Sequence, residues 1–383
     1  MMRRIRVAQI LTSGGIGGAE RSCEWHARVF DRDLLAQLYL FLYRGGSVHE
    51  AIKSIGFPTC VLRWSSGYDL AGRIRLVQAL RAFQPDVIHT HDATPLSRLF
   101  IKLGGRCPVV YSEHGAVALN GHVLWRRAAA WIDGLSTDLV VANSRFTADR
   151  YISLNGRPRR AVRVIYLGIE PEVSGGGCDP KRFSLSAGRT PNSPLRVGFV
   201  GRMEVYKGAL QLPLIASALL RRGVSPLDFV VVGEGPAVSD CVDLSRRLGV
   251  GASMRFLGWR DDVLAIMATF DVLAVPSLWE AFGLVPLQAL AVGTPVVAYD
   301  TGGMREPLAD APDAILVPKG DVEAMVDAIL ELARQTRGVK SSGAKRYVQE
   351  RFDIHRTARE LEGIYLELTE GARTAPAWSA VDE

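Results

Sequence analysis

The sequence predicts an α/β protein built from two Rossmann-like domains, each with a parallel β-sheet. Its 383 residues suffice for two domains of ordinary size. Short runs rich in β-branched residues alternate with longer stretches of helical periodicity, a pattern typical of parallel sheets covered by helices on both faces. The alternation breaks once, in a stretch rich in glycine, proline and serine between residues 171 and 194, which divides the chain near its middle.

The expected strands fall into one set on each side of this break. The first set is Ile5–Leu11, Leu38–Tyr43, Cys60–Leu62, Val87–His89, Val109–Tyr111, Leu139–Ala142 and Val164–Tyr166. The second set is Arg196–Val200, Phe229–Val232, Arg255–Leu257, Val272–Val275, Val296–Ala298 and Ile315–Val317. The predicted organisation is a first domain over 1–170, a linker over 171–194, a second domain over 195–350, a C-terminal helix over 351–371 that can cross back to the first domain, and a disordered tail over 372–383.

Composition narrows the class of protein. No apolar run approaches the roughly 18 residues of a membrane-spanning helix, and no secretory signal precedes the first strand, so we expect a cytoplasmic protein. Five scattered cysteines without a C-x-x-C pair argue against a disulfide framework or a zinc site. The formal charge of +6 is spread along helices without a basic-aromatic motif. It therefore favours an anionic small substrate or an anionic membrane surface over nucleic acid.

Ligands of open parallel sheets bind beyond the carboxyl ends of the strands, so the loops after strands hold the candidate site residues. The first such loop, 12–20, is rich in glycine and leads into a helix, where backbone N–H groups can approach an anion. Gly17 is its candidate ligand contact, and a plain tight turn is the alternative. The loop is not a dinucleotide fingerprint, because Glu20 stands where the third glycine belongs.

Two cations follow the first strand of the second half. Arg202 and Lys207 lie at the mouth of the expected sheet, where fixed positive charge suits a diphosphate leaving group. Two solvated surface cations are the alternative. A P-loop is excluded, since no Gly-Lys-Ser/Thr occurs. After the next strand, the small residues around Glu234, at 233–235, permit close approach of a base or ribose.

The segment 276–290 is the most informative one. Glu280 follows a strand and can accept hydrogen bonds from sugar hydroxyls. The N–H groups of Phe282, Gly283 and Leu284 precede a helix and can face phosphate. Gln288 lies one or two turns into that helix, within reach of a ribose.

Together these motifs resemble the family 4 retaining glycosyltransferases. The shared features in the second half are the Gly-Arg to Lys-Gly loop at 201–208, Gly-Glu-Gly at 233–235 and the segment Glu280–Gln288, which corresponds to an acid-x7-acid segment of the family. In the first half they are Gly-Gly-Ala-Glu at 17–20, Asp-Val-Ile-His-Thr-His at 86–91 and Glu-His-Gly at 113–115. The resemblance implies a GT-B fold, with two Rossmann-like domains facing a central cleft. This chain departs from the family at Gln288, where relatives carry a ribose-binding Glu.

The resemblance also implies the roles of residues. The candidate catalytic residues are His114, Arg202, Lys207 and Glu280, and the candidate donor-binding residues are Gly17, Gly233, Glu234, Gly235, Phe282, Gly283, Leu284 and Gln288. His114 is expected beside the transferred sugar, although an ordinary loop histidine is the alternative. Of the neighbouring pair His89 and His91, one is expected in the core and the other, His91, near the mouth of the cleft.

The implied reaction needs no metal or other cofactor. Asp31-Arg32-Asp33 resembles a metal-binding Asp-x-Asp, but it lies before a strand, away from ligand sites, and is better explained as a turn. The implied partners are a nucleotide-diphosphate sugar as donor and a saccharide or lipid-linked acceptor, in cell-surface glycan, polysaccharide or glycolipid biosynthesis. Transfer would retain the anomeric configuration.

Two other classes stay open. A GT-B epimerase or phosphorylase shares the fold, although no pyridoxal lysine is identifiable. A binding or scaffold protein without catalysis is suggested by Gln288 and opposed by the candidate catalytic residues. Weak peripheral contact with the inner face of the plasma membrane is a further hypothesis. It rests on Arg3, Arg4 and Arg6 and on the aromatic and basic residues at 125–127 and Trp131.

Overall fold

The computed structural model describes residues 3–15, 17–66, 69–91, 93–115, 123–170, 193–336 and 341–374, without the side chains of 123–126, 336 and 371–374. It divides into unit 1, residues 1–168 with 354–383, and unit 2, residues 169–353. Most of the expected linker and of the expected tail lies outside the described residues.

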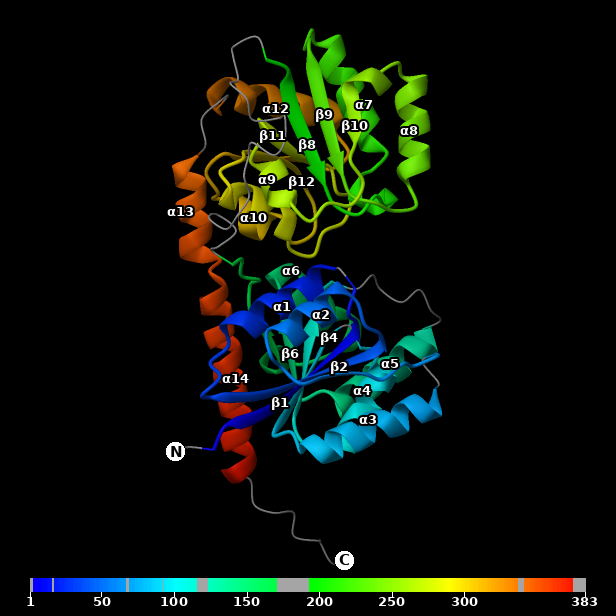
Figure 1. Ribbon diagram of the computed structural model, residues 1–383, viewed down its shortest axis with the longest axis vertical. Coiled ribbons are helices and arrows are strands. Elements are labelled where there is room, and N and C mark those ends of the chain that lie inside the picture. Colours follow the sequence, from blue (N-terminus) through cyan, green and yellow to red (C-terminus); the bar gives the residue numbers. More distant parts are fainter. Residues whose placement is uncertain are drawn as a thin grey trace, which may run out of the picture. The chain divides into compact units, whose positions relative to one another are not determined.

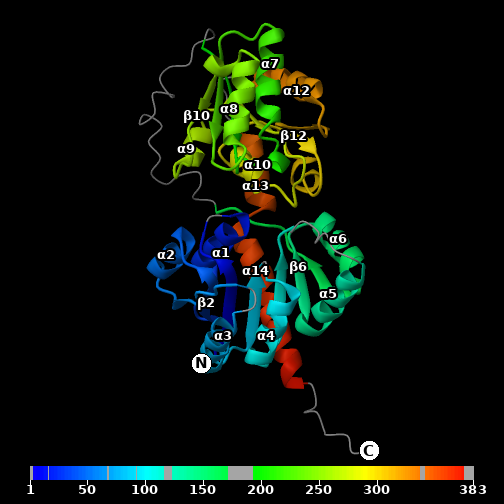
Figure 2. The same cartoon turned by 90° about the vertical axis from the view of Figure 1, so that its right-hand side faces the viewer.

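Unit 1 is a parallel sheet of seven strands covered by helices (Figures 1 and 2). The strands run in the order β3-β2-β1-β4-β5-β6-β7. Their bounds are β1 Ile5–Ser13, β2 Leu35–Arg44, β3 Thr59–Val61, β4 Val87–His91, β5 Val109–Glu113, β6 Leu139–Ala142 and β7 Val162–Val164. The helices are α1 Gly18–Val29, α2 Ser47–Ser54, α3 Leu70–Phe83, α4 Pro95–Gly105, α5 Val123–Ser136, α6 Arg145–Asn155 and α14 Ile354–Thr374.

Unit 2 repeats this architecture with six parallel strands in the order β10-β9-β8-β11-β12-β13. The strands are β8 Leu195–Val200, β9 Leu227–Val232, β10 Met254–Phe256, β11 Val272–Val275, β12 Val296–Asp300 and β13 Ala314–Pro318. The helices are α7 Gln211–Arg221, α8 Val238–Arg247, α9 Val263–Met267, α10 Leu284–Ala291, α11 Arg305–Leu308, α12 Val322–Thr336 and α13 Ser342–Arg351.

The predicted fold class is confirmed: both units are Rossmann-like, and each expected strand occurs. The strand expected at Val164–Tyr166 is displaced and runs instead over Val162–Val164, paired with β6. In each sheet the strand order reverses at one place, between β1 and β4 and between β8 and β11. The crevice at such a reversal, beyond the carboxyl ends of the strands, is where open α/β sheets bind ligands.

The last helix of the chain packs on unit 1. Helix α14 begins at Ile354, three residues later than predicted, because α13 ends at Arg351 and the Phe352 N–H still bonds back to Val348 O. Its buried face includes Leu361 and Tyr365, which join the core of the seven-stranded sheet. In Figure 1 it is the long red helix beside that sheet. The last helix in the sequence thus completes the core around the first strand.

Candidate functional site

In unit 2, the loops that follow four strands are joined backbone to backbone. Met203 N–H donates to Glu234 O at 2.8 Å, Leu278 N–H to Tyr206 O at 2.8 Å and Gly303 N–H to Glu280 O at 3.0 Å. Side chains have no room at these crossings. A Cβ at Gly208 would lie 2.0 Å from Pro276 O, and all L-residues are further disfavoured there by a φ of 79°. The loops therefore hold fixed positions at the crevice.

Lys207 and Glu280 meet at this crevice. The Lys207 Nζ lies 2.8 Å from Glu280 Oε1 and 2.6 Å from Oε2. Both side chains are largely buried, with exposed fractions of 22% and 14%. Because the pair comes from the loops after β8 and β11, on the two sides of the strand-order reversal, it marks the place where a ligand of unit 2 would bind.

Arg202 lies in the same loop as Lys207 but is exposed. Its guanidinium donates to the Tyr206 hydroxyl, lies 5.7 Å from the centre of that ring and approaches Glu204 at 4.0 Å. The structure therefore does not bring Arg202 into contact with Lys207 and Glu280. Its charge stays exposed beside Tyr206.

The residues around the start of α10 have unequal access to a ligand. Phe282 is 2% exposed and packs edge-on against Phe352, with ring centres 5.8 Å apart, so only its backbone can face a ligand. Gly283 precedes the helix with a φ of 108°, a conformation that glycine adopts readily. Leu284 is the first helical residue, and Gln288 is half-buried one turn later. No hydrogen bond of the Gln288 amide occurs among the described residues.

The Gly-Glu-Gly turn after β9 lies against the loop after β8. A Cβ at Gly233 would lie 1.9 Å from Gly201 O, and one at Gly235 would lie 2.4 Å from Met203 O. Glu234 is exposed, and its carboxylate accepts a 3.3 Å hydrogen bond from the Trp259 N–H. The two glycines are thus required by loop packing. Direct donor contact by these residues stays a prediction.

In unit 1, the glycine-rich turn after β1 is held by Glu20. Gly17 occupies the N-cap position of α1 without a side-chain cap, and a Cβ there would lie 2.3 Å from a Glu20 carboxylate oxygen. The Ser13 hydroxyl donates to the other Glu20 oxygen at 3.2 Å. A carboxylate therefore stands beside the turn that we expected to face an anion.

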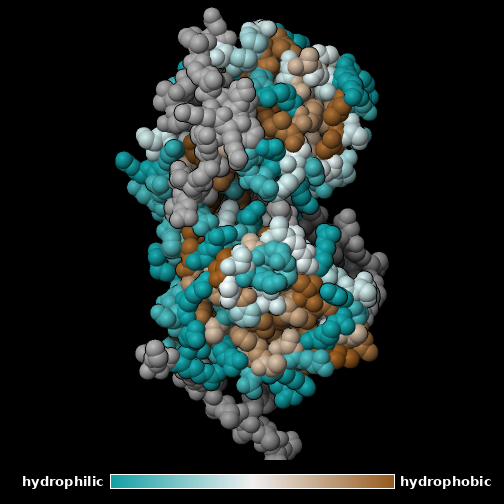
Figure 3. Space-filling view, viewed as in Figure 1, coloured by the Kyte–Doolittle hydropathy of each residue, from teal (hydrophilic) through white to brown (hydrophobic). Residues whose placement is uncertain are grey.

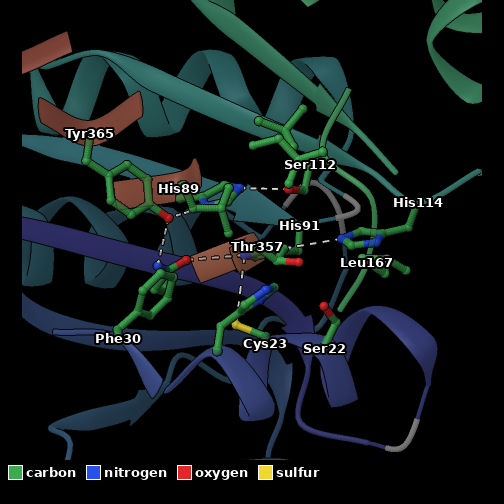
Figure 4. A pocket seen from close by; sticks show the side chains of 15 residues that line it. Ser22, Cys23, Phe30, His89, His91, Ser112, His114, Leu167, Thr357 and Tyr365 are labelled. Atoms are coloured by element: carbon green, nitrogen blue, oxygen red, sulfur yellow. Dashed lines mark hydrogen bonds between the residues drawn. The ribbon is translucent and has the colours of Figure 1, made fainter. Parts of the chain in front are cut away.

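A pocket lies in unit 1 between the sheet, α1 and α14, and histidines line it (Figure 4). His114 follows β5, and its Nε2 lies 3.3 Å from His91 Nδ1. The expectation that His89 and His91 separate into a core and a cleft position was wrong. Both are buried, with ring centres 4.4 Å apart, because residues two apart on a strand share one face of the sheet.

Among the residues that line this pocket, sequence reasoning named only the histidines on β4 and after β5 as candidate site residues. The polar members it missed include Gln9 on β1, His26 on α1 and Tyr365 on α14. Tyr365 and Gln9 are 356 positions apart, yet the hydroxyl and Gln9 Nε2 are 3.2 Å apart. No local sequence pattern predicts a contact between segments so far apart. The available signal was Gln9, a polar residue in the buried part of β1, since buried polar groups need partners.

Burial keeps these histidines neutral. It lowers the pKa of His26 and of His89 to about 3 in each case, and it lowers that of His91 well below 6.5. Burial also lowers the pKa of His114, while the nearby carboxylates of Glu113 and Glu20 act in the opposite direction. The pocket is thus a cluster of neutral imidazoles.

The residues that the structure describes contain no group of three or more His, Cys, Asp or Glu side chains suited to holding a metal ion. Asp31 forms a turn: its Oδ1 accepts from the N–H groups of Asp33 at 2.8 Å and Leu34 at 3.3 Å. The carboxylate satisfies backbone donors of the connection into β2, as expected from its position.

Comparison with known protein families assigns both halves of the chain. Residues 16–173 match the family described as Glycosyltransferase Family 4, and residues 194–335 match the one described as Glycosyl transferases group 1. The chain belongs to the family 4 glycosyltransferases. The resemblance stated from the motifs is thereby confirmed, and the two Rossmann-like units are those of the GT-B fold.

The sequence identity to individual relatives is modest. A D-inositol 3-phosphate glycosyltransferase of Saccharomonospora viridis is 34% identical, over 60% of this chain and 56% of its own length, so the match spans little more than half of that relative. A UDP-Gal:alpha-D-GlcNAc-diphosphoundecaprenol alpha-1,3-galactosyltransferase of Escherichia coli is 21% identical over 83% and 85% of the two chains. The crystal structure of Anabaena Alr3699/HepE with UDP-glucose shares the fold, with a TM-score of 0.80, 22% identity and coverage of 95% and 100%.

We expect stability to fall in mild acid because of the neutral histidines. The unfolded chain binds protons below pH 6.5, whereas buried His26 and His89 resist protonation until about pH 3. The unfolding free energy therefore decreases as the pH falls through this window, by about 1.4 kcal/mol per pH unit for each such histidine.

His26→Phe tests this by chemical denaturation between pH 7 and pH 4. His26 Nε2 has no hydrogen-bond partner and the ring stacks on Phe30, so a phenyl ring fits the environment. The variant should lose stability less steeply toward acid than the wild type, while His355→Gln, at an exposed position, should not change the slope. An unaltered slope in His26→Phe would contradict the assignment of a neutral histidine.

Proposed function

We propose that the protein is a retaining glycosyltransferase that moves a sugar from a nucleotide-diphosphate donor to a saccharide or lipid-linked acceptor. Unit 2 binds the donor and unit 1 contributes His114. The relatives whose names specify a reaction are sugar transferases, and a structural neighbour binds UDP-glucose. These names support the class of reaction.

The observation that carries the proposal is the Lys207–Glu280 pair at the crevice of unit 2. A cation fixed there stabilises the charge that grows on a departing diphosphate. A carboxylate beside it accepts hydrogen bonds from sugar hydroxyls. The pair thus offers one group suited to the diphosphate and one suited to the sugar of such a donor.

A panel of nucleotide sugars tests the proposal. Ligands that bind only the folded state raise the melting temperature, so a thermal-shift screen selects the donor and hydrolysis or transfer is then assayed. A protein that binds a donor without turnover with any acceptor would be the scaffold suggested by Gln288. Conversion of the donor to an isomeric nucleotide sugar would indicate an epimerase. The anomeric configuration of the product tests retention.

We also propose that no metal is required, since Arg202 and Lys207 can supply the charge stabilisation that a cation provides elsewhere. Transfer should therefore proceed at a similar rate after exhaustive treatment with EDTA. Activity that disappears with the chelator and returns with manganese or magnesium would contradict this prediction.

Replacement of the cations should slow turnover. Arg202→Ala and Lys207→Ala each remove a charge from the expected diphosphate position, and loss of one transition-state contact typically costs about 10²–10³-fold in kcat. Arg246→Ala, at an exposed position of α8, is the matched control. Melting temperatures identify any loss of folding in Lys207→Ala, which leaves Glu280 without its partner. Near-wild-type rates in both site variants at saturating donor would refute the assignment.

Gln288→Glu should tighten donor binding. A carboxylate accepts from both ribose hydroxyls, and charge-assisted hydrogen bonds are roughly twice as strong as neutral ones. Lys207 and Arg202 offset its repulsion from the diphosphate. Calorimetry with the donor measures the effect, and Gln335→Glu, exposed on α12, makes the same charge change elsewhere. Unchanged donor affinity would mean that position 288 does not touch the nucleotide.

Membrane contact is proposed for the side of unit 1 formed by α4 and α5. Leu103, Trp131 and Leu135 are exposed there, and Arg106 and Arg127 are exposed on or next to the same helices. In Figure 3 hydrophobic surface gathers over the region where Figure 1 labels α3, α4 and α5. The N-terminal arginines do not extend this surface: the start of β1 lies away from α5 in Figures 1 and 2, and Arg3 pairs with Asp86. No described helix is long and apolar enough to cross a bilayer.

Co-sedimentation with vesicles that contain anionic lipid tests this surface. Binding at low salt should decrease in Trp131→Ala and Leu103→Ala and weaken as salt increases, because salt screens exposed charges. Leu366→Ala, a partly exposed leucine on α14, should bind like the wild type. Absence of wild-type binding at low salt would remove the proposal.

A further inference from the structure

A hydrogen-bonded chain runs through the core of unit 1 from α14 to His114 (Figure 4). The Tyr365 hydroxyl lies 3.2 Å from Gln9 Nε2, Gln9 Oε1 lies 3.2 Å from His91 Nε2, and His91 Nδ1 lies 3.3 Å from His114 Nε2. Gln9, His91 and Tyr365 are all buried. Only the last member, His114, is partly exposed. This run of hydrogen bonds therefore connects the core to the carboxyl end of β5, where a ligand of unit 1 would bind.

The amide of Gln9 determines which groups donate and which accept along this run of hydrogen bonds, because an amide has one accepting end and one donating end. Its nitrogen donates to the Tyr365 hydroxyl and, at 3.4 Å, to Gln37 Oε1. Its oxygen therefore faces His91 and requires a proton on His91 Nε2. Since neutral imidazole carries one proton, His91 Nδ1 is bare and accepts from the Nε2–H of His114.

The other ring nitrogen of His114, Nδ1, is the atom left for a ligand. A neutral His114 that donates through Nε2 has a bare Nδ1, and no described side chain bonds to that nitrogen. A bare nitrogen accepts hydrogen bonds and repels anionic oxygen. The carboxylates of Glu20 and Glu113, which act electrostatically on His114, also disfavour a phosphate in its surroundings.

We infer that Gln9 and His91 are positioning residues that hold His114 in the Nε2–H tautomer, so that its Nδ1 accepts a hydrogen bond from a substrate hydroxyl. The inference rests on the proposed function for the identity of the substrate as sugar or acceptor alcohol. It adds the polarity of the contact: His114 recognises a hydroxyl group, and the diphosphate is left to Lys207 and Arg202. In this arrangement Tyr365 contributes to the site from the last helix of the chain.

Nitrogen-15 spectroscopy of the histidines in the full-length protein tests the tautomer directly. Long-range proton–nitrogen correlation distinguishes protonated from bare ring nitrogens, and the His114 signals are those lost in His114→Asn. We expect His114 to be protonated on Nε2 and bare on Nδ1 at pH 7.5. The opposite tautomer would overturn the inference. Because the spectrum is recorded without substrate, this result is independent of whether the protein transfers sugar.

Two substitutions of His91 then test its effect on the reaction. An Asn side chain places its amide oxygen near the position of His91 Nδ1 and can still accept from His114, whereas Gln reaches only to the position of Nε2. We expect His91→Gln to lower kcat/KM by about 10- to 100-fold, the range found when the hydrogen-bond partner that orients a metal-binding histidine is lost, and His91→Asn to retain a clearly larger share. Equal losses in two variants of equal melting temperature, or no loss in either, would overturn the positioning role.

Discussion

The central interaction of unit 2 is the ion pair between Lys207 and Glu280. It joins the loops after β8 and β11, at 2.6 and 2.8 Å, on the two sides of the strand-order reversal. Close backbone crossings fix both loops: Gly208 lies against Pro276 O, and Gly302 lies against Glu280 O with no room for a Cβ. A carboxylate and an ammonium group in a largely buried position remain stable because each neutralises the other, and a bound diphosphate could compete for the ammonium.

In unit 1 the pocket is lined by neutral histidines, in contrast to the charged pair of unit 2. It gathers four histidines, yet burial makes their charged forms costly, so the fold keeps them neutral, and a hydrogen bond joins two of them, His91 and His114. The network depends on Gln9 and Tyr365, which come from opposite ends of the chain. The C-terminal helix therefore belongs to the polar network of unit 1, and its loss would remove the Tyr365 partner of Gln9 on β1 and of His89 on β4.

The sequence predicted the fold well because strand and helix periodicities are local properties. Each expected strand occurs, and the displaced ones are β7, shifted by two residues, and β3 and β10, each shifted by one. All three lie at an edge of their sheet, where a strand pairs on one side only. The motifs named Lys207 and Glu280 separately, and the structure brings the two side chains into direct contact, which the sequence did not predict; their roles stay predictions. Gln9 and Tyr365 were missed because contacts between distant segments leave no periodic pattern in the sequence. The backbone contact expected of Phe282 stays a prediction, since the burial of its ring does not prevent the N–H group from facing a ligand.

The separate contributions of Lys207 and Glu280 to ligand affinity can be measured by calorimetry. The ligands are a nucleoside diphosphate and its sugar conjugate, with UDP and UDP-glucose as the first pair. Lys207→Met should weaken both ligands by a similar factor, because both carry the diphosphate. Glu280→Gln should bind the free diphosphate at least as tightly as the wild type, since it removes a negative charge, and should lose part of the preference for the sugar conjugate. An unchanged preference in Glu280→Gln would show that this carboxylate does not contact the sugar and would contradict the donor site proposed for unit 2.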